Sequence, residues 1–536
     1  MTSPVAVNSI GMSRTRAWIA TAVLSASLLV VVMDMTILNI ALPSLAKDLS
    51  PSADQQLWIV DVYSLVLAGL LVPASSLADR FGRRLILLVG FGLFGLASAL
   101  ILVAGSPGAV IAIRALLGVG GALIMPTTLS MVRTLFDDPT ERARALALWS
   151  SVAGVGVAIG PLIGGFLLEH FSWHSAFLVN VPLMLIAIVL GVFLLPESRS
   201  ATPGGWDWIS VITAFAGMAL MMWAVKHFGA ESSLRPPMGW VALLAGAALL
   251  VVFVRRCLTL ERPMLDLDLF SSRIFSAGII AALGSMFSMA AAMLLFAQWL
   301  QAVEGSSPVQ AGAQFLPLAA AGAVASMAAP WLAERIGPRI VISAGILVAA
   351  VGMIGVWVIP TWVTSGDLDY VYAVGPLALV GVGMGSLAIG SSLIMSGSPE
   401  DRAGNAAAME ETSYEVGNVL GVSLLGSVAA VLYRGELDGS GVLGDLDTTV
   451  SDHVRESIGS AVGVAEGGGN AALADAAGTA FTDAMSVTSL VGGVLMLGVA
   501  AAVYALIPRG TRLDARIDSG APVDGPAPAA DPGTRA

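Results

Sequence analysis

The sequence has little charge and almost no cysteine. Only 12% of its 536 residues are Asp, Glu, Lys or Arg, whereas 56% are hydrophobic, and the mean hydropathy is +0.85. So few polar side chains cannot cover the surface of a water-soluble domain. The single cysteine, Cys257, excludes a disulfide within the chain and gives no metal-binding spacing. The composition therefore predicts a polytopic membrane protein.

Motifs for nucleotide hydrolysis and metal binding are also missing from the sequence. The phosphate-binding pattern GxxxxGK[ST] does not occur, so ATP is not the expected energy source. We predict no catalytic residue, no metal site and no cofactor, and we do not expect an enzyme.

Apolar segments separated by charged or Gly/Pro-rich breaks predict fourteen transmembrane helices, since about twenty apolar residues span a bilayer. The first segment is too long for a signal peptide and is expected to be retained. The expected helices cover residues 17–42, 57–77, 85–105, 109–132, 145–168, 175–195, 207–226, 238–255, 274–300, 312–333, 339–360, 370–395, 404–432 and 485–507.

The basic residues indicate how the chain is oriented. If the N-terminus is inside, twenty Lys and Arg residues lie in cytoplasmic segments and five in outside segments, with Lys47 and Lys226 among the outside ones. Because cytoplasmic loops are enriched in Lys and Arg, we expect both termini to be cytoplasmic. The expected location is the cell membrane.

An internal repeat divides the fourteen helices. LADRFGRR at 77–84, between the second and third helices, recurs as LAERIGPR at 332–339, between the tenth and eleventh, although two short basic loops can also match by chance. A parallel repeat of this kind pairs the first six helices with the last six. The expected organisation is a tail at 1–16, a first half at 17–196, inserted helices at 207–255, a second half at 274–507 and a disordered tail at 508–536.

One long outside loop is expected at 434–484, before the last helix. It contains nine Asp or Glu residues, which either concentrate cations at the mouth of a pathway or form a solvated linker. Val450, Val454 and Ile458 recur at four-residue spacing and predict a short amphipathic helix within this loop.

Asp34 lies within the first apolar segment and needs an explanation. A buried Asp costs about 2.5 to 3.5 kcal/mol on membrane-insertion scales, so Asp34 is a functional candidate unless it merely faces a watery vestibule. Arg114 is the only basic residue deep in a predicted helix and needs an acid or a carbonyl as its partner. We expect the two to pair, so that a proton on Asp34 releases Arg114. A purely structural ion pair is the alternative.

Further acids lie in the second and thirteenth segments. Asp61 stands near the outer end of the second helix and is expected to face an outer vestibule. In the thirteenth helix Glu411 and Glu415 share a face, whereas Glu410 points about 100° away. Low dielectric and like charges make it hard for all three to be ionised at once, which suits a proton-coupled carrier. An amphipathic surface segment is the alternative for this helix.

The fifth segment carries a run of small residues. Gly156, Gly160, Pro161, Gly164 and Gly165 form the pattern GxxxGPxxGG. Small residues at four-residue spacing let helices approach closely, and the proline favours a kink. By itself, the pattern is also compatible with ordinary packing in a membrane bundle.

Together these motifs resemble the fourteen-helix drug:proton antiporters of the major facilitator superfamily, most closely the quaternary-ammonium pumps of the QacA type. The resemblance extends from Arg16 to Pro508. It implies an all-α major facilitator fold with two six-helix halves and two inserted helices. Ser75 and Leu117 depart from the family's usual glycine and glutamine. The resemblance rests on DMTILNIALP, LADRFGRR, the Arg114 segment, GVAIGPLIGG, WHSAFLVNVP and AAMEETSYEVGN.

The resemblance implies roles for these residues. Asp34, Arg114 and Asp61 would couple transport to protons, and the fifth-helix motif is associated with antiport. Aromatic side chains near the acids could add cation–π contacts to a bound cation. The expected substrate contacts are Asp61, Glu410, Glu411 and Glu415 with Trp58, Tyr63 and Tyr414, and the expected gating residues are Asp79, Arg80, Gly82, Arg83, Arg84, Gly156, Gly160, Pro161, Gly164 and Gly165.

The predicted function is export of lipophilic cationic drugs, antiseptics and dyes by alternating access, driven by a proton gradient. The tenth helix has no carboxylate, which favours monovalent over divalent cations. Expected partners are protons, small organic cations and the lipid bilayer, with no nucleic acid, and a monomer is expected. The alternatives are an exporter of one endogenous metabolite or lipid, and a membrane sensor or scaffold that transports nothing.

Overall fold

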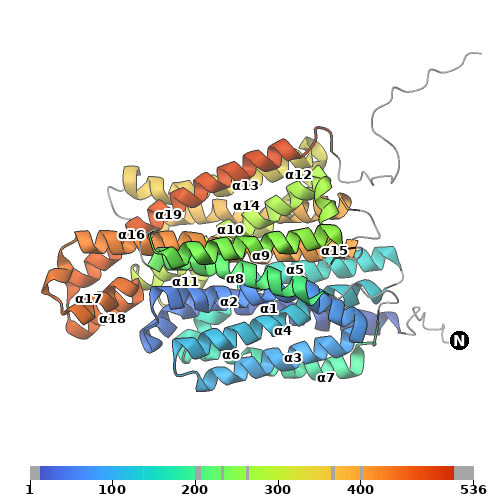
Figure 1. Ribbon diagram of the computed structural model, residues 1–536, viewed down its shortest axis with the longest axis horizontal. Coiled ribbons are helices and arrows are strands. Elements are labelled where there is room, and N and C mark those ends of the chain that lie inside the picture. The colour runs from blue at the N-terminus through green and yellow to red at the C-terminus, as the bar shows by residue number, and fades with distance from the viewer. Residues whose placement is uncertain are drawn as a thin grey trace, which may run out of the picture.

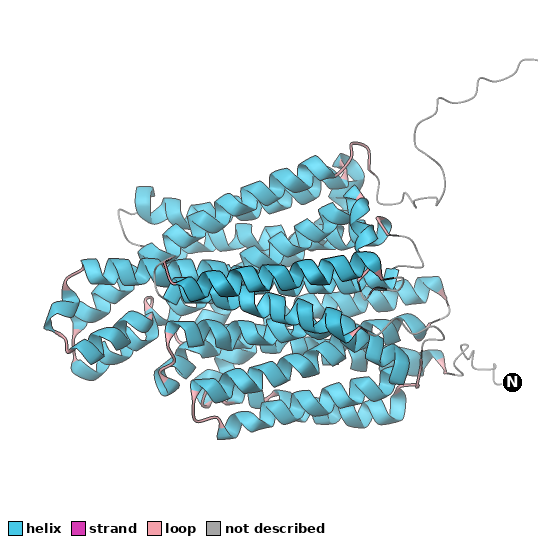
Figure 2. Cartoon of the chain, in the orientation of Figure 1, coloured by secondary structure: helices cyan, strands magenta, loops and turns pink. Residues whose placement is uncertain are grey.

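A computed structural model describes residues 12–136, 138–199, 207–230, 235–260, 263, 265–363, 368–398 and 403–511. Every regular element within these ranges is helical (Figure 2). Thirteen helices among the described residues are long and apolar enough to cross a membrane, and α5 coincides with the fifth predicted segment. The expected tail at 1–16 lies mostly outside the described residues, as does that at 508–536.

The first half contains the elements that correspond to the first six predicted helices. Its buried apolar side chains form one continuous cluster. The sixth predicted helix is divided into α6 and α7. The elements are α1 (Arg14–Leu49), α2 (Ala53–Phe81), α3 (Arg83–Leu100), η1 (Ile101–Val103), α4 (Pro107–Thr134), α5 (Pro139–His170), α6 (Ser175–Leu178) and α7 (Asn180–Leu194).

The second half has its own apolar cluster and contains two π-helical segments, η3 and η5. In Figure 1 most of this half lies above the first, at the yellow-green to red end of the colour scale. Its elements are η2 (Leu267–Ser271), α10 (Arg273–Ala302), α11 (Pro308–Gln314), α12 (Leu316–Ile336), α13 (Pro338–Val358), η3 (Ile359–Val363), α14 (Tyr370–Ser396), α15 (Ala403–Leu420), η5 (Gly421–Leu425), α16 (Gly426–Gly439) and α19 (Ala471–Leu506).

The segment between α16 and α19 is shorter than expected and largely helical. The thirteenth helix continues to Gly439 and the last begins at Ala471, so both ends of the expected loop at 434–484 belong to long helices. Between them are η6 (Val442–Asp445), α17 (Thr448–Glu456) and α18 (Ile458–Gly468). We call the end of the bundle that carries α17 and α18 the cap end, and the end that carries residues 77–84 the loop end (Figure 1).

The internal repeat recurs in the local geometry at both ends of the bundle. Ser52 and Gln55 form a reciprocal capping box at the start of α2, and Ser307 and Gln310 form the same box at the start of α11, 255 residues later. At the loop end, Gly82 and Gly337 occupy equivalent positions and both have positive φ, of 119° and 87°. The repeated sequence thus encodes the same turn and the same helix start in each half.

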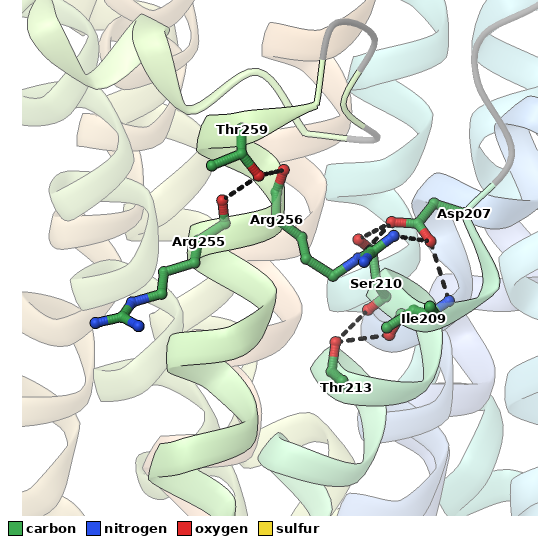
Figure 3. A network of polar contacts seen from close by, with 7 residues as sticks. All are labelled: Asp207, Ile209, Ser210, Thr213, Arg255, Arg256 and Thr259. Atoms are coloured by element: carbon green, nitrogen blue, oxygen red, sulfur yellow. Dashed lines mark hydrogen bonds and ion pairs between the residues drawn. The ribbon is translucent and has the colours of Figure 1, made fainter.

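The inserted helices α8 (Trp208–Ala230) and α9 (Pro237–Thr259) form an antiparallel pair, with α8 packed on α2 and α16. Asp207, just before α8, joins them: Arg256 donates two hydrogen bonds to its carboxylate, at 3.1 and 3.0 Å (Figure 3). The Ile209 amide and the Ser210 hydroxyl donate to the same carboxylate. Burial would raise the pKa of Asp207, but these hydrogen bonds outweigh it and lower that pKa below its usual value.

The two halves meet at the cap end. The Gln301 side chain on α10 donates to the Ile40 carbonyl on α1 at 3.0 Å. The small loop helices add contacts to the first half, because Glu456 accepts a hydrogen bond of 2.7 Å from the Ala53 amide at the start of α2. A carboxylate at a helix N-terminus is favoured by the unpaired amides and the helix dipole there.

Candidate functional site

Asp34 lies at the centre of the first half and is 2% exposed. Arg114 on α4, which is 1% exposed, donates through Nη1 to Asp34 Oδ2 at 2.6 Å. Asn180, the first residue of α7, donates to Asp34 Oδ1 at 2.7 Å. The expected ion pair between Asp34 and Arg114 is therefore present, and both carboxylate oxygens are hydrogen-bonded. A buried charge pair needs such additional bonds to offset its desolvation.

Arg114 also contacts α2. Its Nε donates to the Ile59 carbonyl at 3.1 Å, and its guanidinium carbon lies 4.5 Å from the centre of the Tyr63 ring. The Tyr63 hydroxyl approaches the Val31 carbonyl on α1 at 3.4 Å. A guanidinium over an aromatic face gains cation–π attraction, which is strengthened by burial. Three helices, α1, α2 and α4, are thus held together around one cation.

Glu415 on α15 is the acid of the second half that approaches this centre. It is 3% exposed and lies near Ser64 on α2, whose hydroxyl accepts a hydrogen bond of 2.7 Å from Asn418. The charge of Arg114 acts on the Glu415 carboxylate, and the charge of Glu415 acts on the Tyr63 hydroxyl. Glu415 and Asn418 therefore lie on the face of α15 that is turned to the first half.

Glu410 and Glu411 lie one turn further toward the loop end of α15. Glu410 accepts a hydrogen bond of 2.6 Å from the Tyr414 hydroxyl, four residues later. Glu410 is buried, whereas Glu411 is partly exposed. The carboxylates of α15 thus differ in surroundings, which gives them different capacities for holding a proton or a cation.

Asp61 is fully buried, contrary to the expectation that it faces an outer vestibule. Its Oδ2 lies 3.0 Å from Nζ of Lys226, which is 0% exposed and belongs to α8, so counting Lys226 with an outside segment was wrong. The Lys226 ammonium also lies 4.3 Å from the centre of the Trp58 ring. Ser423, in the π-helix η5, donates to the same Asp61 oxygen.

The glycines of α5 pack against the part of α1 that carries Asp34. A Cβ atom at Gly156 would lie 3.2 Å from Val32, and one at Gly160 would collide with Thr36. A Cβ atom at Gly164 would lie 3.4 Å from Ile37. Three of the small residues therefore set the distance between α5 and α1.

Pro161 and Gly165 face the second half instead. A Cβ atom at Gly165 would collide with the Pro308 carbonyl at the start of α11, and one at Gly312 would collide with the Pro161 carbonyl. The backbones of α5 and α11 thus touch directly at the cap end. The fifth-helix motif joins the Asp34 centre to the contact between the halves.

The expected gating residues of the segment 79–84 lie at the loop end. Arg83 donates to Asp79 Oδ1 at 3.1 and 2.9 Å, while Arg80 is exposed. Gly82 adopts φ 119°, a left-handed conformation that favours glycine, and a Cβ atom there would lie 2.5 Å from Glu197. Arg84 donates to the Val192 carbonyl of α7, and its equivalent Arg339 donates to the Tyr504 carbonyl of α19.

Comparison with known proteins settles the family. The profile of the Major Facilitator Superfamily matches residues 24–422. The chain belongs to the major facilitator superfamily. Members of this superfamily are transporters and not enzymes, and the apolar helices make the chain a multi-pass membrane protein.

Related members of the superfamily are drug exporters. The multidrug efflux pump LfrA of Mycolicibacterium smegmatis is 39% identical over 91% of this chain and 96% of that protein. The methyl viologen resistance protein SmvA of Salmonella typhimurium is 35% identical over 77% of this chain and 82% of that protein. The inward-facing, unoccupied structure of a bacterial homologue of the human lysosomal transporter Spinster has the same fold, with a TM-score of 0.63, 18% identity and coverage of 92% and 98%.

Sequence reasoning missed several polar partners in this facilitator. Asn180 stands in the segment WHSAFLVNVP, where a single amide in an apolar helix was a usable signal. Lys226 was a stronger signal, because it stands at the end of an apolar run. The partners Ser64 and Ser423 had no such signal, since serine is common in membrane helices. Among the described residues, no three His, Cys, Asp or Glu side chains come together to hold a metal ion.

Proposed function

We propose that this chain exports lipophilic organic cations in exchange for protons. The observation that carries the proposal is the buried Asp34–Arg114 pair, whose arginine charge also acts on a second buried acid, Glu415, from the other half of the molecule. Each acid can bind either a proton or a positive charge, and the charge of Arg114 acts on both. The drug exporters among the relatives support the same class of substrate.

The exchange follows from the position of Arg114. When Asp34 is ionised it holds Arg114, and Glu415 remains available for an organic cation. When Asp34 takes up a proton, its attraction for Arg114 falls, and the field of Glu415 draws the guanidinium toward the substrate position. Arg114 then competes with the bound cation. Protonation of one acid therefore favours release of substrate from the other, which is antiport.

The arrangement of the halves supports alternating access. The cap end would face outside and the loop end the cytoplasm, with both termini inside, as the basic residues indicate. The contacts between α5 and α11, and between α1 and α10, would then close the outer side. Uptake from the cytoplasm or the inner leaflet would precede opening of these contacts. Asp79, Arg83 and their neighbours would stabilise the opposite state.

The acid positions favour monovalent substrates. SmvA is named for resistance to methyl viologen, a dication. In this chain the part of α12 that crosses the bundle, 316–333, contains no acidic residue, and Glu410 is already bonded to Tyr414. Of the acids on α15, Glu415 is then the buried one that is left to balance a positive charge. We therefore propose quaternary ammonium and phosphonium cations as the main substrates.

The test uses purified protein in liposomes with an imposed pH gradient. Adding ethidium or tetraphenylphosphonium should dissipate the gradient, and the Asp34→Asn variant should abolish this effect. A gradient that persists with every cation tested rules out drug:proton exchange. If the gradient instead falls with an endogenous metabolite or lipid, a dedicated exporter is the correct function; if no solute moves, a sensor or scaffold is favoured.

A further inference from the structure

The strongest unexplained feature of the molecule is a lysine ammonium buried in its interior. Lys226 Nζ lies 3.0 Å from Asp61 Oδ2 and 4.3 Å from the centre of the Trp58 ring, and neither Asp61 nor Lys226 has an exposed side chain. The antiport scheme given above uses Arg114 and does not need this second cation. Removing an ammonium from water is costly, so its position calls for a function or a compensating gain.

The surroundings of the Lys226 ammonium have the chemistry of a binding site for an organic cation. A carboxylate supplies the counter-charge, and the face of an indole supplies cation–π attraction, as in sites for quaternary ammonium ligands. Apolar side chains complete the walls: Met222 is buried here in one cluster with Leu65 and Val419. Flexible methionine side chains adapt to ligands of different shape.

The ammonium does not satisfy this site fully. Asp61 Oδ1 has no hydrogen-bond partner among the described residues, and Lys226 Nζ makes its ion pair without a well-oriented hydrogen bond. A lysine ammonium has three donors, and leaving donors or acceptors unpaired in the interior costs free energy. A cation without N–H groups, such as a quaternary ammonium, would not incur the donor part of that cost.

Three parts of the chain meet at this site. Asp61 and Trp58 come from α2 in the first half, Ser423 from η5 in the second half, and Lys226 from the inserted helix α8. The end of α8 is fixed to the second half, because Arg434 on α16 donates to the Gly229 carbonyl at 2.6 Å. Displacement of Lys226 would therefore change contacts with both halves.

We propose that Lys226 is an internal substitute for the substrate: its ammonium fills a cation site made by Asp61 and Trp58, and a lipophilic cation displaces it during transport. This inference rests on the proposed function and extends it by assigning the inserted helix α8 a competing role. When no substrate is bound, Lys226 thus provides the counter-charge for Asp61. Substrates bind only as far as they outcompete Lys226.

The first test uses the reactivity of amines, because the sequence contains just two lysines, Lys47 and Lys226. Lys47 has a side chain that is 61% exposed and serves as the internal reference. Purified wild-type protein is treated with succinimidyl acetate, with and without saturating tetraphenylphosphonium, and acetylation is measured by mass spectrometry. We expect slow acetylation of Lys226 that rises several-fold with the cation, and no change at Lys47.

The second test compares cation affinities. If Lys226 fills the site about 90% of the time, the Lys226→Met variant should bind tetraphenylphosphonium about tenfold more tightly than the wild type. The matched control, Lys47→Met, removes the other lysine and should leave the affinity unchanged. Adding Trp58→Leu to Lys226→Met should reverse the gain, because the aromatic wall is then lost.

The outcomes separate this inference from the proposed function. If wild-type protein binds tetraphenylphosphonium, but Lys226 acetylation is constant and Lys226→Met binds no more tightly, Lys226 is a structural partner of Asp61 and the inference is wrong. If Lys226→Met does not fold, the acetylation of wild-type protein decides alone. If wild-type protein binds neither tetraphenylphosphonium nor ethidium, the proposed function fails and the inference fails with it.

Discussion

Neutralising Asp34 should both destabilise the protein and abolish coupling, and these two effects can be separated. In the Asp34→Asn variant Arg114 stays buried, with 1% of its side chain exposed, and loses its counter-charge. Breaking a buried pair on one side costs about 3 to 5 kcal/mol, because the remaining charge is uncompensated. About 3 kcal/mol corresponds to a change of roughly 150-fold in a folding equilibrium.

The double variant Asp34→Asn, Arg114→Gln removes both charges and should recover most of this stability, since the two residues act as one coupled unit. It should not recover proton-coupled efflux, because no acid remains at this position. The matched control is Asp438→Asn, which breaks the exposed Arg455–Asp438 pair and should cost less than about 1 kcal/mol.

The assays are the fraction of detergent-solubilised protein that stays monodisperse after heating, and ethidium efflux from cells. The reasoning is refuted if Asp34→Asn tolerates heat as well as Asp438→Asn, or if the double variant is no more stable than Asp34→Asn. Uphill ethidium efflux by the double variant would show that Asp34 is not the coupling acid.

Three further predictions concern other parts of the molecule. Glu415→Gln should reduce efflux of small quaternary cations more than Glu411→Gln, because Glu415 is the acid near Arg114; equal profiles across a panel of cations would contradict this. Gly165→Ala should weaken the contact between α5 and α11 and reduce transport at least tenfold, whereas Gly498→Ala, where a Cβ meets nothing within 4 Å, should have little effect on efflux. The pair of Asp207 and Arg256 should stabilise the α8–α9 hairpin by about 1 kcal/mol. Folding lowers the pKa of Asp207. The stabilisation is therefore complete above the pKa that Asp207 has in the unfolded chain, and it is lost as the pH falls through the pKa that Asp207 has in the folded protein. Heat stability of wild type and Asp207→Asn should therefore differ at pH 7 and converge once the pH lies below the folded-state pKa of Asp207, and a difference that persists there would refute the assignment.

The order of helices was predictable because each apolar segment is long enough to span a bilayer and is bounded by charge or by Gly and Pro. The extension of α16 to Gly439 and of α19 back to Ala471 was not, since these turns carry polar and small residues like those of a loop. Packing between helices, and not hydropathy, decides whether such turns stay helical.

The Asp34–Arg114 pair was predictable by elimination, because a deep arginine in an apolar helix has few possible partners. The environment of Asp61 was not predictable from the sequence. Its distance from the end of α2 indicated water, but α8 covers this position, and no pattern within α2 records what packs on it. The roles of these residues in proton coupling and substrate binding remain predictions.

The π-helix η5 interrupts the α-helical hydrogen bonding of the thirteenth helix, and its position along the helix determines which side chains face the first half. A π-turn contains one more residue than an α-turn, and each residue of a helix turns it by about 100°. If the extra residue moved along the helix by one turn, Ser423 would rotate away from Asp61 while the ends of the helix stayed in place. Such a local twist of the second half would remove the Ser423 hydrogen bond from Asp61 without breaking a membrane helix.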